Sequence, residues 1–365
     1  MSPQDMTMMR EKLEQQTGFR WLDVDDVAGV KGVLQTRGWI GGMAEIADVS
    51  YAGEGNMNLV MRVIVNEGRG ERRLIMKQGR PWVEKYPEIA APWDRVEREW
   101  HIYRKIRIFD GIGESMPGLV GFDPDMRLLV LEDLGEGCDL KSFYDGRVLN
   151  GEEIDWLSEF LKRVHGVMIY KEDRADFSNE SMRLLNHEYM FMQPLDKQRV
   201  VDERLDDLEN DLVDTINDLK RDEPLREAVG ELGEIYLSDE CRAGDVLLHG
   251  DFYPGSWHWP IKRGKGRRGI LDWEFSFVGN RGFDVGVYIA HMAMSNHKID
   301  AVEQFLDGYG WDGNSVMSSF AGNEVIRRIA GVAQLPIEKT NEWRSELLKL
   351  GRDAVVHGDW RILWG

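Results

Sequence analysis

Three acidic residues in the last third of the chain have the types and spacing that phosphoryl transfer requires. Asp251 follows an apolar run in LLHGD, and Asp272 and Glu274 follow a second apolar run in GILDWEF, 21 positions further on. A carboxylate at the end of a buried strand is held rigidly and still faces solvent or a ligand. In phosphoryl transfer one carboxylate orients the attacking hydroxyl and another holds the magnesium of the nucleotide. Aspartates that cap the turns of a hairpin are the alternative, and the features upstream favour the chemistry.

We expect these three carboxylates to have different roles. Asp251 would accept or orient the proton of the substrate hydroxyl, which needs little base strength because positioning dominates a largely dissociative transition state. Asp272 would bind magnesium directly. Glu274 shares a face with Asp272 if the segment is extended, so it would be a second metal ligand or hold a metal-bound water.

Two neighbouring residues are expected to support this site without taking part in the chemistry. His249 precedes Asp251 by two positions, and we interpret it as a brace for the loop through hydrogen bonds, with general base catalysis as the alternative. Asp284 lies in GFDVG, where a helix is expected to begin, and its predicted role is to cap that helix and brace a loop.

A glycine-rich turn upstream has the residue types of a phosphate-binding loop. Gly53, Gly55, Asn56 and Asn58 lie in GEGNMN between two expected strands. Glycines let the backbone approach a phosphate closely, and the exposed N–H groups can then donate to it. An ordinary turn has the same composition, so the motif gains weight only together with the other residues.

Lys77 lies in the apolar segment LIMK, which is expected to be a strand. A lysine that points inward from such a strand needs a charged partner. Nucleotide phosphates or a helix glutamate would serve, and of Glu97 and Glu99 in the following helix we prefer Glu99. The alternative is a solvated lysine that points outward.

Two further motifs lie at the expected lobe boundary and near the C-terminus. Glu132, Asp133 and Leu134 end a strand where the chain would cross between lobes, and the exposed backbone groups there could pair with an adenine ring. A solvated strand end is the alternative. Arg327 and Arg328 are adjacent on an expected helix, where they diverge by about 100°. They could bind an anionic or polyhydroxyl ligand, or form ion pairs with glutamates along the helix.

The pattern of apolar residues predicts an α+β protein with a small antiparallel sheet followed by a mostly helical region. The expected N-terminal nucleotide-binding lobe is 1–134, and the expected catalytic and substrate-binding lobe is 135–365. Within the first lobe we predict a helix over 18–38, a hairpin over 43–66, a strand carrying Lys77, an irregular loop over 79–93, a helix that starts at Asp94 and a strand over 127–134. Within the second we predict helices over 151–170, 195–236, 284–296, 299–309, 315–334 and 338–356, and a hairpin over 245–275.

Composition excludes several classes of partner. The formal net charge is −19, from 46 basic and 65 acidic residues, which opposes binding to nucleic acids and anionic membranes. No run approaches the roughly 18 apolar residues of a membrane span, and the N-terminus has no apolar signal core. The two cysteines, Cys138 and Cys241, give no disulfide framework and no metal spacing, so a reducing cytoplasm is expected.

Taken together, these residues resemble the protein-kinase-like small-molecule kinases, the aminoglycoside phosphotransferase and choline kinase group, and within it the methylthioribose kinase subfamily. The resemblance covers about residues 45–335. The matching segments are GEGNMN at 53–58, the Lys77-Gln78 pair, EDL at 132–134, HGDFYPGS at 249–256, DWEFSFVGNRGFDVG at 272–286 and the two arginines at 327 and 328.

The resemblance implies a bilobal protein-kinase-like fold, ATP and Mg²⁺ as cofactors, and a sugar such as 5-methylthioribose, a metabolite of methionine salvage, as acceptor. It also leaves a homodimer open. It assigns Asp251 as catalytic and places it against the substrate hydroxyl. The implied magnesium ligands are Asp272, Glu274 and Ser256. The implied nucleotide-binding residues are Gly53, Gly55, Asn56, Asn58, Lys77, Glu99, Glu132, Asp133 and Leu134. The implied acceptor-binding residues are Asp251, Tyr253, Trp273, Arg327 and Arg328.

The sequence departs from the subfamily beside the expected acceptor site. Trp273 replaces a proline, Tyr253 and Pro254 replace His-Thr, and YPEIAAPWD at 86–94 replaces a GESWP string. Ser256 stands where most of the wider group has a metal-binding asparagine, although the subfamily also has serine there. An aminoglycoside or a choline-like amine therefore remains an alternative acceptor. A pseudokinase that binds nucleotide without catalysis is a further alternative, which the presence of Lys77, Asp251 and Asp272 disfavours.

Overall fold

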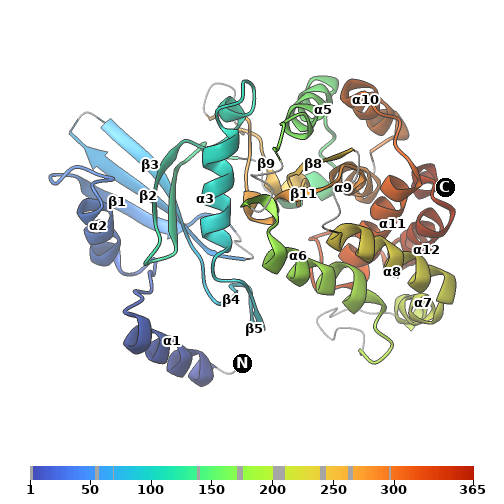
Figure 1. Cartoon of the computed structure of the whole chain (residues 1–365), viewed down its shortest axis with the longest axis horizontal. Coiled ribbons are helices and arrows are strands. Elements are labelled where there is room, and N and C mark those ends of the chain that lie inside the picture. The colour runs from blue at the N-terminus through green and yellow to red at the C-terminus, as the bar shows by residue number, and fades with distance from the viewer. Residues whose placement is uncertain are drawn as a thin grey trace. The chain divides into compact units, whose positions relative to one another are not determined.

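The structure is a computed structural model that describes residues 3–53, 57–68, 70–137, 140–170, 176–199, 210–238, 244–261, 266–295 and 297–365. The residues pack into two compact units (Figure 1). Unit 1 consists of Met1–Gly137 and Trp259–Glu274, and unit 2 of Cys138–His258 and Phe275–Gly365. The expected lobes assigned 259–274 to the C-terminal part, whereas this segment groups with unit 1. Cys138 and Cys241 lie outside the described residues.

Unit 1 is built on a five-stranded antiparallel sheet in the order β1-β2-β3-β7-β6. The strands are β1 Glu45–Tyr51, β2 Leu59–Glu67, β3 Gly70–Gln78, β6 Leu119–Asp123 and β7 Leu128–Glu132. The predicted hairpin, the strand that carries Lys77 and the strand over 127–134 are confirmed, and β6 was not predicted. Lys77 is paired with Leu129 of β7, so it lies in the interior of the sheet.

The two faces of this sheet have different partners. Met61, Val63, Leu74 and Met76 belong to a buried apolar cluster that also contains residues of α2 Val27–Thr36. Because successive side chains alternate between faces, Lys77 points to the other face. The helix α3 Arg95–Ile106 contacts β6 and β7 and supplies Glu99, the partner of Lys77.

Several features of unit 1 differ from the predictions. The helix expected over 18–38 is helical only in α2, because Asp26 caps it by accepting a hydrogen bond from the backbone N–H of Gly29. The first helix, α1 Pro3–Thr17, was not predicted. The loop expected over 79–93 contains a small antiparallel pair, β4 Trp82–Val83 and β5 Tyr86–Ala90. Asp94 occupies the N-cap position of α3 as expected but makes no side-chain cap bond.

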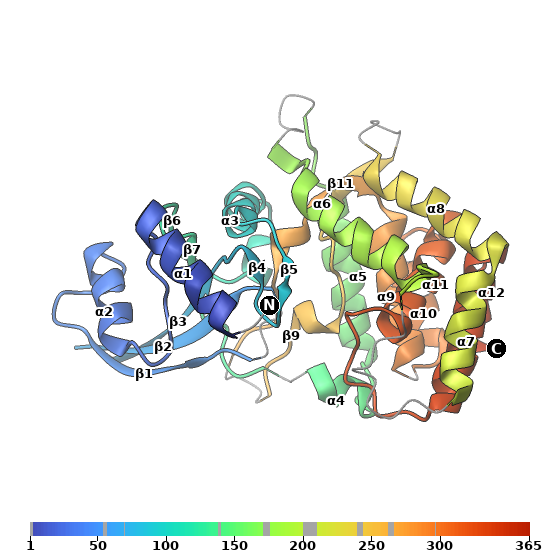
Figure 2. The same cartoon turned by 90° about the horizontal axis from the view of Figure 1, so that it is seen from below.

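Unit 2 is mostly helical, as predicted. Its helices are α4 Leu140–Tyr144, α5 Gly151–His165, α6 Glu180–His187, α7 Asn210–Arg221, α8 Glu223–Leu237, α9 Gly282–Met294, α10 Ile299–Tyr309, α11 Ser315–Ala330 and α12 Asn341–His357. Every residue of α9 is buried, and α11 packs against both α9 and α12. Figure 2 shows α7 alongside α12. In the described residues no helix is long and apolar enough to cross a membrane.

The helix predictions for unit 2 differ from the structure mainly at their ends. α5 stops at His165, five residues before the predicted end at 170. The stretch over 195–236 is divided into α7 and α8, because Asp222 caps a new helix whose first turn contains a proline. Residues 200–209 of that prediction lie outside the described part of the chain. The four C-terminal helices agree with α9 to α12.

The hairpin predicted over 245–275 is wrong in its pairing. The strand β8 Asp245–Leu248 pairs with β11 Phe277–Asn280, and Leu248 lies opposite Phe277. The segment between them leaves this two-stranded sheet and contains the short strands β9 Trp257–His258 and β10 Gly269–Ile270. The expected catalytic loop thus starts where β8 ends, and the expected metal segment ends where β11 begins.

Candidate active site

Lys77 forms a buried ion pair in unit 1, as the sequence predicted. Its Nζ lies 2.7 Å from Oε2 of Glu99 and 2.8 Å from Oδ1 of Asp272. The side chains of Lys77 and Glu99 are 4% and 0% exposed, whereas that of Asp272 is 45% exposed. Burial works to lower the pKa of Lys77, but the carboxylates of Asp272, Glu99 and Glu274 outweigh it and hold this pKa well above its usual value. The ammonium therefore stays charged.

The expected metal segment has an unusual backbone. Asp272 has φ +62°, in the left-handed region that a non-glycine residue rarely adopts. A short 3₁₀ turn, Trp273–Phe275, follows, so the segment is not extended as the argument for Glu274 assumed. Glu274 nevertheless points into unit 1, where its Oε2 accepts a hydrogen bond of 2.8 Å from Asn58 and lies 3.5 Å from Nε of Arg95. Backbone strain of this kind is typical of functional sites.

The carboxylates of Asp272 and Glu274 fit a magnesium ion that is shared with a nucleotide. Magnesium is commonly held by one or two carboxylates, with substrate phosphates and water as the other ligands. Asp272 offers an exposed carboxylate whose Oδ2 has no partner among the described residues. Those residues contain no cluster of three or more metal-binding side chains, so a nucleotide or water would have to supply the other ligands.

The other expected nucleotide-binding residues are placed as follows. Gly53 has φ +77°, while Gly55 and Asn56 lie outside the described residues. Asn58 is buried and bonded to Glu274, which links the glycine-rich turn to the metal segment. Glu132 ends β7 with an exposed side chain.

Asp133 and Leu134 are fixed by contacts inside unit 1. The carboxylate of Asp133 accepts a hydrogen bond of 2.7 Å from Nε of Arg62 and another from the N–H of Gly135. The carbonyl of Leu134 accepts from the N–H of Arg267. These bonds hold the segment 132–134 in unit 1, and its predicted contact with an adenine ring stays a prediction.

The loop that carries Asp251 is held by Asp284 of α9. The two carboxylate oxygens of Asp284 accept hydrogen bonds from the backbone N–H groups of His249 at 2.6 Å and Gly250 at 3.0 Å. Nε2 of His165 lies 3.1 Å from the same carboxylate. The predicted role of Asp284 as a loop brace is confirmed, but the N-cap of α9 is Arg281.

Gly250 of this loop must be glycine. Its φ is +84°, and a Cβ atom there would lie 2.1 Å from the carbonyl oxygen of Phe275.

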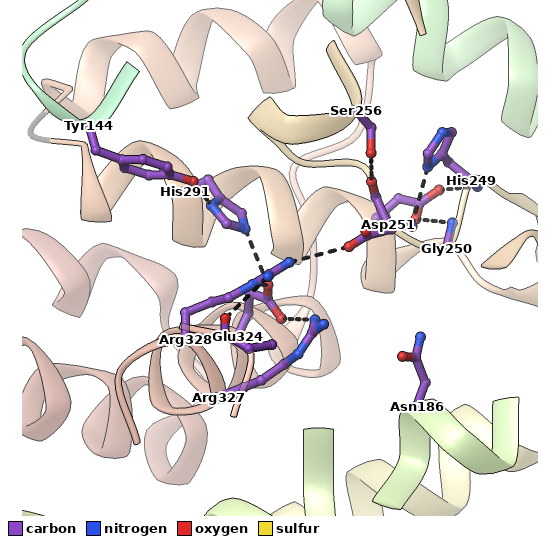
Figure 3. A network of polar contacts seen from close by, with 12 residues as sticks. Tyr144, Asn186, His249, Gly250, Asp251, Ser256, His291, Glu324, Arg327 and Arg328 are labelled. Carbon is purple, nitrogen blue, oxygen red and sulfur yellow. Dashed lines mark hydrogen bonds and ion pairs between the residues drawn. The ribbon is translucent and has the colours of Figure 1, made fainter. Parts of the chain in front are cut away.

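The side chain of the next residue, Asp251, is 17% exposed, and its Oδ1 accepts from NH2 of Arg328 at 3.3 Å (Figure 3). Nδ1 of His249 accepts from the N–H of Asp251, which confirms His249 as a brace.

Ser256 contacts the backbone of the same loop. Its buried Oγ donates to the carbonyl of Asp251 at 2.8 Å (Figure 3). This bond fixes the path of the chain from Asp251 to the turn Pro254–Ser256. The assignment of Ser256 as a magnesium ligand stays a prediction.

Arg327 and Arg328 of α11 are both buried and both pair with Glu324. NH1 of Arg327 lies 2.9 Å from Oε2 of Glu324, and Nε of Arg328 lies 2.6 Å from Oε1. The helix ion pairs considered as an alternative are therefore made. They do not exclude ligand binding, because Arg328 also reaches Asp251.

Tyr253 contributes to the same cluster, and Trp273 lies in unit 1. The guanidinium of Arg328 lies over the ring of Tyr253, 4.5 Å from its centroid. Gly255 makes room for that ring, because a Cβ atom would lie 2.3 Å from its hydroxyl oxygen. Trp273 is fully buried and its indole N–H donates to the carbonyl of Ile270, and its role in substrate binding stays a prediction.

Sequence reasoning missed several residues of these two clusters. Arg95 is fully buried and bonds to backbone carbonyls of unit 1, including those of Met57 and Pro92, besides its contact with Glu274. Glu324 precedes Arg327 and Arg328 by three and four positions, a helical spacing that could have identified it as their partner. His291 was missed because nothing local marks it.

A family model matches most of this chain. Residues 64–320 match the model of the phosphotransferase enzyme family described as APH. The chain belongs to this family. The chain is similar to the methylthioribose kinase of Exiguobacterium sibiricum, with 27% identity over 71% of this chain and 64% of that protein. It is 24% identical to the methylthioribose kinase of Bacillus velezensis, over 82% of this chain and 84% of that protein.

Coverage of the relatives is uneven. The methylthioribose kinase of Erwinia tasmaniensis is 26% identical over 68% of this chain, and the match spans 61% of that protein. The match to the Exiguobacterium protein likewise spans less than two thirds of its length.

Solved structures confirm the fold. The AMP-bound spectinomycin phosphotransferase APH(9)-Ia has a TM-score of 0.52 at 11% identity and covers 92% of this chain and 98% of its own. The ethanolamine kinase of Plasmodium vivax has a TM-score of 0.50 at 12% identity, over 97% of this chain and 91% of its own. The expected protein-kinase-like α+β fold is therefore correct.

Proposed function

We propose that this phosphotransferase is an ATP- and magnesium-dependent kinase that phosphorylates a hydroxyl of 5-methylthioribose or a related sugar. The observation that carries the proposal is the ammonium of Lys77, buried between the carboxylates of Glu99 and Asp272 in unit 1. In protein kinases a strand lysine paired with a helix glutamate positions the nucleotide phosphates, beside an aspartate that binds magnesium. The names of the curated relatives support the sugar as acceptor.

Each residue has a role that follows from its surroundings. Lys77 would bind the phosphates, and Asp272 and Glu274 would hold magnesium, which offsets the negative charge that the phosphates carry. Asp251 would accept a hydrogen bond from the acceptor hydroxyl and orient its oxygen for attack on the terminal phosphate. Asp284 holds the loop of Asp251 through the N–H groups of His249 and Gly250, which positions the carboxylate of Asp251 before the acceptor binds.

The charge of the cluster around Asp251 favours a neutral acceptor. The carboxylates of Asp251 and Glu324 face the guanidiniums of Arg327 and Arg328, and these formal charges sum to zero. A polycationic acceptor would need an excess of carboxylates there. A polyhydroxylated sugar needs donors and acceptors without net charge, which this cluster offers.

The test is a transfer assay with ATP, magnesium and a panel of acceptors, followed by ³¹P NMR of the products. The panel contains 5-methylthioribose, ribose, choline and an aminoglycoside. We expect a new phosphomonoester signal and equal formation of ADP with 5-methylthioribose. Transfer to choline or the aminoglycoside but to neither sugar would overturn the acceptor assignment. Nucleotide binding without transfer to any acceptor would overturn the kinase activity.

A further inference from the structure

A buried carboxylate on α11 connects Arg327 and Arg328 to a histidine and a tyrosine. Glu324 is 1% exposed, and its Oε1 lies 2.6 Å from Nε of Arg328 and 3.2 Å from Nε2 of His291 (Figure 3). Its Oε2 lies 2.9 Å from NH1 of Arg327. On the far side of the imidazole, Nδ1 of His291 lies 2.6 Å from the hydroxyl of Tyr144.

The protonation states fix the direction of the hydrogen bonds between Tyr144, His291 and Glu324. Burial acts to raise the pKa of Glu324, but Arg327 and Arg328 outweigh it and hold this pKa well below its usual value. An ionised carboxylate only accepts hydrogen bonds, so Nε2 of His291 must carry a proton. Burial lowers the pKa of His291 to about 4, so the ring is neutral and Nδ1 is an acceptor. The hydroxyl of Tyr144 therefore donates to His291, which donates to Glu324.

The two arginines are not equivalent in this arrangement. Arg328 uses its three nitrogens in three directions, toward Glu324, the carbonyl of Ala333 and Oδ1 of Asp251. Arg327 bonds to Glu324 through NH1, and its buried Nε has no partner among the described residues. A buried guanidinium donor without a partner is costly unless a ligand accepts from it.

We propose that Glu324, oriented by His291 and Tyr144, is a positioning residue that sets Arg328 against Asp251 and leaves donors of Arg327 for the acceptor. This rests on the proposed kinase function. A purely structural role, in which Glu324 only neutralises two buried arginines, would affect stability and leave the kinetics of acceptor transfer unchanged. The two roles are therefore separated by kinetics.

The experiment compares two site variants with two matched controls. Tyr144→Phe removes the donor to His291, while Tyr288→Phe removes a buried hydroxyl that has no partner among the described residues. Glu324→Gln removes the carboxylate that pairs with the arginines. Asp222→Asn removes the carboxylate that pairs with Arg352 between α8 and α12 and retains a capping side chain.

We expect Glu324→Gln to lower kcat with 5-methylthioribose by about 100-fold, because the guanidiniums lose the carboxylate that orients them. Tyr144→Phe should lower kcat/KM for the acceptor by about 3- to 10-fold, the effect of one buried hydrogen bond. The KM for ATP should stay within about twofold in both, since unit 1 is unchanged, and so should all kinetic constants of the two controls.

The outcomes separate this proposal from the one on which it rests. If the wild-type protein transfers phosphate to no acceptor, the proposed function fails and the role of Glu324 fails with it. If the wild-type protein is active but Tyr144→Phe has the same kinetics as Tyr288→Phe, only the positioning role is overturned. Tyr144→Phe decides the matter alone if Glu324→Gln does not fold.

Discussion

Replacement of Lys77 by methionine tests the buried ion pair of unit 1. Methionine has a similar length and no charge, so the change removes the ammonium and keeps most of the apolar packing. Glu99 is then left fully buried without its partner at 2.7 Å. Loss of one partner from a buried pair costs about 3–5 kcal/mol of unfolding free energy. The carboxylate of Asp272 adds less, because it is 45% exposed and water can solvate it.

The double variant Lys77→Met with Glu99→Met measures the coupling free energy between the two charges. Both charges are then gone, and two apolar side chains of similar volume fill the space. The double variant should be less destabilised than the sum of the two single variants by about 2–3 kcal/mol. Urea unfolding of all four proteins at pH 7.5, followed by tryptophan fluorescence, measures this coupling.

The cost of Lys77→Met should also depend on pH. Burial raises the pKa of Glu99 to about 7 with Lys77 present, and removal of the ammonium raises it further. A carboxyl group whose pKa is raised in the folded state stabilises the protein at low pH. This stabilisation is lost as the pH rises through the raised pKa. The variant should therefore be closer to the wild type at pH 6 than at pH 8. The buried pair would be refuted if the losses of unfolding free energy in the two single variants add up to that of the double variant and are the same at pH 6 and pH 8.

Three further predictions concern single residues of unit 2. Burial lowers the pKa of His297 to about 4, so between pH 6.5 and 4 the unfolded chain binds a proton that the native protein does not. The free energy of unfolding should therefore fall by about 3 kcal/mol over this range. Urea unfolding of His297→Gln at the same pH values should lack this part of the fall. Tyr253→Leu should lower kcat/KM for the acceptor by about 5- to 10-fold through loss of the ring beneath Arg328, whereas Tyr253→Phe should keep it in the same steady-state assay. Asp284→Asn loses one acceptor for the loop amides and should lower kcat by about 10- to 100-fold with unchanged ADP binding by calorimetry.

Much of the fold could be predicted because local signals agreed with tertiary packing. Lys77 in an apolar strand required a carboxylate, and Glu99 was the one correctly chosen. The helices after residue 282 have apolar periodicity and, in the case of α11, a capping asparagine at 314. The short strand β6 was missed because LVGFD contains a glycine and ends in an aspartate, which are turn residues in most contexts.

What the sequence could not show within the site has tertiary causes. The positive φ of Asp272 depends on the packing around it, so the extended geometry assumed for Glu274 could not be tested from sequence. Trp273 was interpreted as a substrate contact from its place beside two acids, and the sequence could not show that its large apolar ring is fully buried in unit 1. His291 meets Tyr144 over 147 positions of sequence, and no local pattern encodes such a contact.

The central claim is tested most directly by the rate of phosphate transfer from ATP to 5-methylthioribose, measured with the wild-type protein and with Asp251→Asn. The variant keeps the shape of the side chain and removes the carboxylate that would orient the hydroxyl. We predict transfer by the wild-type protein and a rate at least about 100-fold lower in the variant, with ATP binding unchanged. Equal rates in the two proteins would contradict the role of Asp251, and no transfer by the wild-type protein to any acceptor would contradict the account as a whole.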